Sequence, residues 1–203
     1  MSKKSLLYIT FFVTLSLAFY FSIVYFVPEF NDKKPTPIGE VKDFTFTTQD
    51  GKPFSKKDMD GKIAVVEYFF TTCKGICPVL NGNMRDEIYN KYKDVPNFLI
   101  VSHTCDPEKD SVPVIKKYAD SLKVDTQKWV FLTGRKDSLY NMARYSYKID
   151  DPKNNLTDIK DDFLHTQFWA LINPQGEVIG IYDGLKQKEI NSLKKRLDEM
   201  IQN

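Results

Sequence analysis

The chain has 203 residues, of which 42% are hydrophobic and 28% are charged. This composition is typical of a folded protein and excludes an intrinsically disordered chain. Its 29 Lys and Arg residues nearly balance its 27 Asp and Glu residues, which excludes a protein that binds nucleic acid through bulk positive charge.

An uncharged, apolar stretch occupies residues 6–27 and follows Lys3 and Lys4. About 20 apolar residues span a bilayer as a helix, and positive charge on the N-terminal flank favours a cytoplasmic N-terminus. A cleaved signal peptide would have a shorter apolar region and a small-x-small cleavage site, and a mitochondrial presequence would be rich in Arg. We therefore predict a cytoplasmic tail (residues 1–5), an uncleaved transmembrane anchor (6–27) in a bacterial inner membrane, and a periplasmic remainder.

The region after the apolar stretch begins with a predicted linker. Residues 28–38 are polar and contain several prolines, so we expect an extended tether, and residues 39–203 form the expected domain. The domain opens with a predicted β-hairpin, because the alternating stretch 41–48 is followed by Asp50 and Gly51, a tight-turn signal.

The middle of the domain alternates strands with helices. Residues 63–70 are almost all apolar, as in a central strand covered on both faces, and apolar side chains then recur every fourth residue from Leu80 to Tyr92, as on one face of a helix. The same patterns predict strands at 97–102 and 129–132, helices around 115–122 and 139–143, a closing hairpin from 165–172 and 178–182, and a C-terminal helix at 190–201. This order predicts an α/β domain with a thioredoxin-like mixed sheet and helices on both faces, preceded by one transmembrane helix.

Two cysteines follow the predicted central strand. Ligand sites in such sheets collect at the carboxyl ends of the strands, where Cys73 and Cys77 lie. Pro78 suits the first position of a helix, which makes Cys77 the expected N-cap and places both thiols at a helix N-terminus. The positive end of the helix dipole and the nearby Lys74 favour the thiolate, the form that attacks disulfides and binds metals.

The role of these thiols depends on a third partner. Two cysteines at this spacing could form a disulfide, a redox pair or two metal ligands. The chain has two histidines, and His165 precedes a predicted strand on a loop that a thioredoxin-like fold would bring against the cysteine loop. Two thiolates and one imidazole would make a soft site suited to Cu(I) and able to hold Cu(II).

Three segments occur in order at 69–80 (FFTTCKGICPVL), 106–110 (DPEKD) and 163–166 (FLHT), the last leading into 168–183. Together they resemble the SCO/SenC family of membrane-anchored copper proteins, and the similarity runs from about Ile38 to the C-terminus. The resemblance implies a thioredoxin-like fold and one copper ion bound through Cys73, Cys77 and His165. It also implies a role in assembling the binuclear copper centre in subunit II of cytochrome c oxidase.

On this interpretation the protein is a metallochaperone and not an enzyme, and it takes copper from an upstream donor and passes it to subunit II. Two alternatives use the same residues. One is a thiol-disulfide oxidoreductase, with Cys73 and Cys77 as the redox pair, that reduces the copper-binding cysteines of the oxidase, and the other is a copper or redox sensor. A peroxiredoxin-like peroxidase is disfavoured because its Pro-x3-Thr-x2-Cys pattern needs a proline near Glu67 or Tyr68.

Four residues near these loops have expected roles. Cys105 is an odd third cysteine, and buried apolar packing is a simpler explanation for it than a resolving thiol or an alternative ligand. His103 is expected to be a structural histidine in the loop after the second strand, with a transient copper ligand as the alternative. Asp106 and Asp110 are expected to organise a turn and to cap the helix that begins near Ser111, with a role in tuning the copper site or in docking as the alternative.

An acidic stretch, residues 150–162, lies just before His165. It is rich in turn-forming residues, so a solvated loop is the simple interpretation. The alternative is a mobile flap that moves His165 on and off the metal and meets the partner protein.

Overall fold

The computed structural model describes residues 2–26, 36–154, 159 and 162–202, in two compact units, Met1–Thr36 and Pro37–Asn203. The first unit contains helix α1 (Lys3–Phe26), whose 24 residues are long and apolar enough to cross a bilayer. Residues 28–35 of the predicted linker lie outside the described residues, as do 155–158, 160 and 161 of the acidic stretch.

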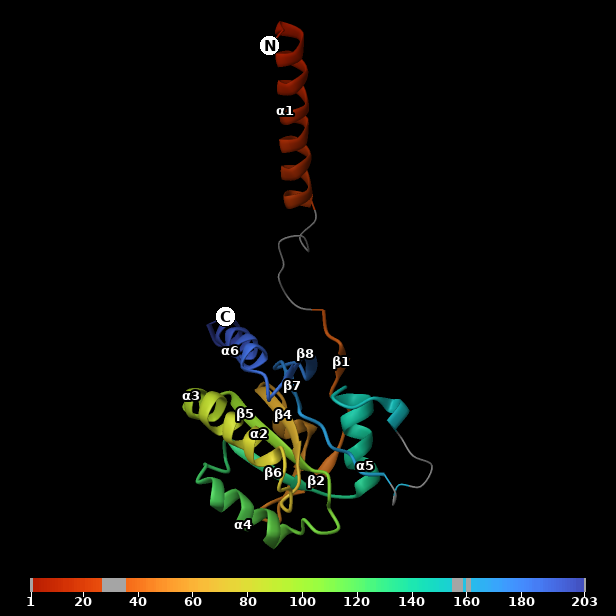
Figure 1. The fold of residues 1–203 in the computed structure, drawn as a ribbon, viewed down its shortest axis with the longest axis vertical. Helices are drawn as coiled ribbons and strands as arrows, with labels where there is room; N and C mark the ends of the chain where they lie inside the picture. The colour runs from red at the N-terminus through yellow and green to blue at the C-terminus, as the bar shows by residue number, and fades with distance from the viewer. Residues whose placement is uncertain (1, 27–35, 155–158, 160–161, 203) are drawn as a thin grey trace. The chain divides into compact units, whose positions relative to one another are not determined.

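The second unit is built on one mixed sheet of eight strands in the order β1-β8-β7-β4-β5-β6-β2-β3 (Figure 1). The strands are β1 (Gly39–Glu40), β2 (Thr45–Thr48), β3 (Pro53–Ser55), β4 (Ile63–Phe69), β5 (Phe98–Thr104), β6 (Trp129–Thr133), β7 (Phe168–Ile172) and β8 (Glu177–Asp183). Strands β4, β5 and β6 are parallel neighbours, and the other pairs are antiparallel. The predicted mixed sheet is therefore confirmed.

Helices cover both faces of this sheet (Figure 1). One face carries α2 (Cys77–Asn83), which continues through a π-helical segment, η3 (Met84–Tyr89), into α3 (Asn90–Tyr92), together with α4 (Val112–Leu122) and α6 (Gln187–Gln202). The other face carries α5 (Lys136–Asn141) and its π-helical continuation η4 (Met142–Ser146). Two short 3-10 segments, η2 (Lys56–Met59) and η5 (Pro152–Asn154), lie in the connections.

Strand β4 shows how the sequence produces the two layers. Every residue of β4 is buried, as expected for a central strand, and successive side chains alternate between the faces. Val65 and Phe69 pack with α2, α4 and α6, whereas Val66 and Tyr68 pack with α5 and η4. Glu67 therefore points into the layer beneath α2, where a carboxylate is unexpected.

The expected N-terminal hairpin is present, with Phe46 opposite Phe54 and a positive φ of 74° at Gly51 in its turn. Two features differ from the predictions. The two-residue strand β1, which pairs Gly39 with Val178 of β8, was not expected. Strand β5 continues through Thr104, so His103 lies within a strand and not in the following loop. Its ring stacks on Tyr68 in the core on the α5 face of the sheet, which favours this longer strand.

Candidate metal centre

The cysteine loop lies at the carboxyl end of β4, between this strand and α2. The backbone N–H of Cys73 donates a hydrogen bond to the carbonyl of Phe70 (3.2 Å), which turns the chain back towards the sheet. Helix α2 begins at Cys77, and Ile76 precedes it with helical dihedral angles (φ −80°, ψ −27°). The predicted N-cap is thus wrong by one residue, and Cys77 is instead buried in the first turn, beside Pro78.

A cavity of about 220 Å³ brings the predicted donor atoms together. Its lining includes Cys73 and Cys77 from the cysteine loop, Cys105 from the end of β5, and His165 from the segment that precedes β7. The remaining lining residues are Tyr68, Phe70, Ile76, Phe163 and Thr166. Two thiols and an imidazole separated by about 90 residues in sequence therefore share one mostly apolar space.

The two thiols of the loop differ in acidity. Partial burial opposes ionisation of Cys73, but hydrogen bonds from the Cys77 thiol and from the backbone of Gly75, Ile76 and Cys77 hold the pKa of Cys73 below its usual value. Burial, followed by the Cys73 thiol, raises the pKa of Cys77 to about 12. Cys73 is therefore the more acidic and more reactive thiol of the pair, and Cys77 keeps its proton until its sulfur binds a metal or forms a disulfide.

His165 lies exposed at the mouth of the cavity. Its Nδ1 is 3.0 Å from the carbonyl oxygen of Phe163, which favours the tautomer that donates from Nδ1 and leaves the Nε2 lone pair free. In the part of the chain that the structure describes, no three His, Cys, Asp or Glu side chains lie close enough together to hold a metal ion. The donor types fit a soft metal, so binding would require His165 to close on the thiols.

Asp110 connects the cysteine loop to the neighbouring strand. Its fully buried carboxylate accepts hydrogen bonds from the backbone N–H (3.2 Å) and hydroxyl of Thr71 and from the hydroxyl of Thr104. Thr71 lies two residues before Cys73, so Asp110 fixes the start of the loop. The predicted capping role is wrong, because Ser111 is the N-cap of α4 and the Asp110 side chain points away from this helix, towards the cysteine loop and the end of β5.

Asp106 has the turn-organising role expected of it. Its carbonyl accepts the backbone N–H of Asp110 (2.8 Å), and its own N–H donates to the Thr104 hydroxyl (2.9 Å). Lys109 pairs with its carboxylate at 2.9 Å. These contacts form the turn that directs Asp110 at the cysteine loop.

His103 is a structural residue on the opposite face from α2. It is fully buried, stacks on Tyr68 with ring centroids 5.1 Å apart, and shares a hydrogen bond of 3.1 Å between its Nε2 and the Tyr147 hydroxyl. Burial lowers its pKa to about 3, so the ring stays neutral. His103 does not line the cavity, which agrees with the structural interpretation and not with a copper ligand.

Cys105 combines packing with a place at the cavity. It is buried in the cluster formed with α5, its N–H donates to the Phe69 carbonyl (2.8 Å), and its carbonyl accepts from the Tyr140 hydroxyl (2.8 Å). Burial raises the pKa of its thiol well above the usual value, which disfavours a nucleophilic role. All three cysteines are free thiols in this structure.

Glu67 is a buried carboxyl group that the sequence analysis missed. The Ser102 hydroxyl donates to Oε1 of Glu67 (2.7 Å) and accepts from the indole N–H of Trp129 (2.7 Å). Oε2 of Glu67 has no hydrogen-bond partner of normal geometry, although the Trp169 indole lies near enough to lower the pKa of Glu67. Burial raises its pKa to about 7. The signal was a single carboxylate within an otherwise apolar central strand.

The fold and this cavity define a class: a thioredoxin-like domain that presents a dithiol and an imidazole for redox or soft-metal chemistry. A family model described as SCO1/SenC matches residues 32–202, and the chain belongs to the SCO1/SenC family. It is 31% identical over 150 residues to the "SCO1 protein homolog" of Bacillus subtilis (strain 168), which covers 72% of this chain and 75% of that protein.

Two solved structures extend this comparison. BsSco, described as a member of the Sco family of cytochrome c oxidase assembly proteins, has a TM-score of 0.68 and 26% identity, over 83% of this chain and 97% of that one. Arabidopsis thaliana ScoI, solved with copper bound, has a TM-score of 0.62 and 25% identity, over 81% of this chain and 98% of that one. The predicted family and fold are confirmed, as is copper as a metal that proteins of this family bind.

Proposed function

We propose that this chain is a copper metallochaperone that binds one copper ion through Cys73, Cys77 and His165. The observation that carries the proposal is the single cavity into which the fold brings all three side chains. Thiolate and imidazole donors suit copper, and the copper-bound relative supports the same metal for this chain.

Delivery would follow from the unequal exposure of the three ligands. His165 is exposed, Cys73 is partly exposed and Cys77 is buried. A partner's thiolate can therefore displace His165 and then Cys73, each of which regains a proton or solvent contact, before Cys77 is released. The relative's description as an assembly protein of cytochrome c oxidase supports this oxidase as the destination, and we propose subunit II, with its binuclear copper centre, as the acceptor.

The location proposed for this exchange is the outer face of a bacterial inner membrane. Helix α1 would anchor the chain, with Lys3 and Lys4 on the cytoplasmic side and the domain in the periplasm. Copper would reach the domain there from an upstream donor, and the linker predicted from the sequence of residues 28–38 would let the domain reach a membrane-bound oxidase.

The proposal is tested by an anaerobic Cu(I) titration of the reduced full chain in detergent against a competing chelator. We expect tight one-to-one binding that weakens at least about tenfold in His165→Ala, since one of three ligands is lost. Thr72→Ala, which removes an exposed side chain next to Cys73, is the matched control and should bind as the unaltered chain does. Weak binding that is insensitive to His165 would contradict a copper carrier.

The acidity difference within the cysteine pair favours one alternative, a thiol-disulfide oxidoreductase. The Cys73 thiolate would attack a partner's disulfide and release one partner thiol, and Cys77 would then attack the Cys73 sulfur, forming the Cys73–Cys77 disulfide and releasing the second thiol. Cys77→Ser should then trap the mixed disulfide on Cys73 with a model peptide disulfide. Reduction of that peptide at a rate unaffected by His165→Ala, together with weak copper binding, would favour this function.

A further inference from the structure

Both ends of the acidic stretch before His165 contact one buried guanidinium group. Arg144, in η4, donates from Nη1 and Nη2 to the two carboxylate oxygens of Asp162 (2.7 and 3.0 Å) and from Nε to Asp150 (2.8 Å). Asp150 and Asp162 are the first and last residues of the stretch. A single side chain therefore joins the two ends of this loop at its base.

This arrangement differs from an ordinary surface ion pair. The Arg144 side chain is only 2% exposed and that of Asp162 only 5%. The guanidinium also lies over the ring of Tyr140, 5.4 Å from its centroid, and Asn154 adds a side-chain hydrogen bond to Asp150 (2.7 Å). A buried, bidentate Arg–Asp pair contributes little net stability compared with apolar packing. Its two parallel hydrogen bonds nevertheless favour one geometry for the groups that it joins.

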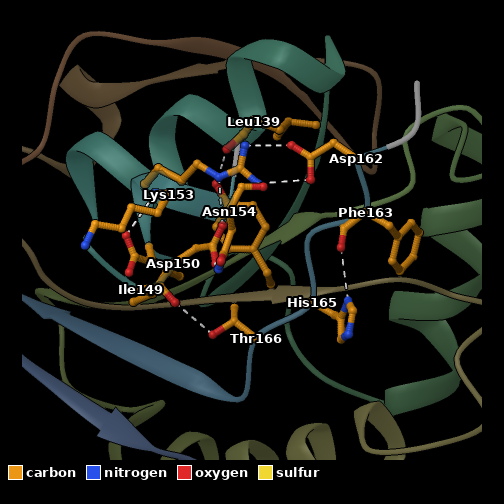
Figure 2. A network of polar contacts seen from close by, with 12 residues as sticks. Leu139, Ile149, Asp150, Lys153, Asn154, Asp162, Phe163, His165 and Thr166 are labelled. Atoms are coloured by element: carbon orange, nitrogen blue, oxygen red, sulfur yellow. Dashed lines mark hydrogen bonds and ion pairs between the residues drawn. The ribbon is translucent and has the colours of Figure 1, made fainter. Parts of the chain in front are cut away.

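Asp162 lies on the same short segment as the candidate ligand His165, so the contact that holds Asp162 also restrains this segment. Figure 2 shows Asp162, Phe163 and His165 following one another along the same segment. The Phe163 ring meets Phe70 of the cysteine loop edge to face, with centroids 5.1 Å apart, and its carbonyl accepts from His165 Nδ1. Leu164 is 3% exposed and anchors the segment in the core.

The segment is also tied on the far side of His165. The Thr166 hydroxyl donates to the carbonyl of Ile149 (2.9 Å), the residue just before Asp150 (Figure 2). His165 is thus held between two attachments to the same short region, 149–150, one direct and one through Arg144. Only Phe163 and Leu164 separate Asp162 from His165, so the contact between Arg144 and Asp162 fixes the backbone within three positions of the ring.

We propose that Arg144 is a positioning residue of the metal centre, which through Asp162 sets how far the His165 ring stands from the Cys73 and Cys77 thiols. The inference rests on the proposed function, in which His165 is a copper ligand. Ligand geometry must be held within about 0.5 Å for full affinity, and loosening the segment reduces the fraction of molecules whose His165 is within reach.

The test compares two conservative variants with a matched control. Arg144→Lys keeps the positive charge and removes the two-pronged contact, and Asp162→Asn keeps the shape and removes the negative charge. Arg135→Lys alters an exposed Arg–Asp pair beside α5, in which Asp137 is the partner. All are made in the full chain in detergent, and urea unfolding of the metal-free protein shows whether each variant folds, so that either variant alone suffices for the test.

Copper binding is measured with Cu(I) by chelator competition and with Cu(II) by electron paramagnetic resonance, whose nitrogen hyperfine splitting reports the imidazole. Both variants should bind about tenfold or more weakly and lose nitrogen coupling, as expected for a residue that orients a ligand, while Arg135→Lys changes neither. In a His165→Ala background, Arg144→Lys should cause no further loss.

Equal loss in both backgrounds, or unchanged affinity and spectrum, would overturn the inference. Wild-type affinity and spectrum in His165→Ala itself would instead overturn the proposed ligand set, and this inference with it.

Discussion

The two sides of the cavity are built in different ways. Cys73 lies on a short loop after a fully buried strand and Cys77 in the first turn of the helix that follows, and the start of the loop is fixed by the buried carboxylate of Asp110. His165 lies exposed on a segment that follows an acidic stretch, and its position depends on a polar contact made through Arg144. The cysteine side of the cavity is therefore part of the core, whereas the His165 side is a segment held by contacts to η4 and to residues 149–150.

This difference suits a protein that must both bind and release a metal. On the proposed function, a thiol pair fixed by the sheet would supply the larger part of the affinity without an ordering cost at binding. A third ligand on an exposed segment can leave first, because its departure disturbs few buried contacts. A carrier with all three ligands in the core would bind tightly but would exchange slowly with a partner.

The largest expected effect lies on the core side. Cys73→Ser or Cys77→Ser should weaken Cu(I) binding at least about a thousand-fold, or about 4 kcal/mol, because a soft thiolate is replaced by a hydroxyl that does not ionise. The measurement is anaerobic competition with a Cu(I) chelator.

Cys105→Ala serves as the matched control for that experiment, since it removes a thiol that lines the same cavity. It should change copper affinity little. A loss equal to that in the Cys73 or Cys77 variants would show that the wrong pair of thiols has been assigned to the metal.

The second expected effect concerns the attachment of the cysteine loop. Asp110→Ala would leave the part-buried Thr71 N–H and hydroxyl and the buried Thr104 hydroxyl without their acceptor. Each unsatisfied buried donor costs about 1–3 kcal/mol, with relaxation reducing the sum, so we expect the free energy of unfolding to fall by about 3–4 kcal/mol. Urea unfolding of the reduced, metal-free chain measures it.

Asp120→Ala, an exposed carboxylate on α4 paired with Lys116, is the control and should change stability by less than about 0.5 kcal/mol. If Asp110→Ala were equally mild, the loop would be held by its own backbone contacts and the difference between the two sides of the cavity would shrink.

The sequence predicted the core side better than the exposed side. Hydrophobic periodicity located strands β4 to β8 and the helices between them, because each element buries one or both faces and the alternation is written in the residues. The same strand pattern predicted Cys73 and Cys77 at a strand end, and the expected thioredoxin-like fold predicted His165 on a loop beside them. The structure brings these three residues to one cavity.

Long-range polar contacts could not be predicted in the same way. Asp110 and Arg144 act on residues 39 and 18 positions away, Thr71 and Asp162, and neither pairing follows from a local pattern. A buried Asp just before a helix resembles an ordinary cap, which is why Asp110 was misassigned. His103 was misplaced because aromatic packing with Tyr68 and Tyr147 extends β5 beyond its apolar run.

The smallest expected effect tests how dry the core beneath the cysteine loop is. Burial raises the pKa of Glu67 from 4.5 to about 7, so the folded state prefers its neutral form. Between these pH values the folded chain holds a proton that the unfolded chain has lost, so the free energy of unfolding falls as pH rises. The total from this group is about 3 kcal/mol at most, and the loss levels off above about pH 8.

Glu67→Gln stays neutral at every pH and should escape that loss, so its stability relative to the unaltered chain should increase between about pH 5 and 7.5 in urea unfolding. Glu108→Gln, at an exposed position, should show no such trend. Because the ionised Glu67 also raises the pKa of Cys77, the variant should make that thiol easier to deprotonate. A constant stability difference across this pH range would mean that water reaches Glu67, and that the cysteine side of the cavity is less firmly built into the core than its contacts indicate.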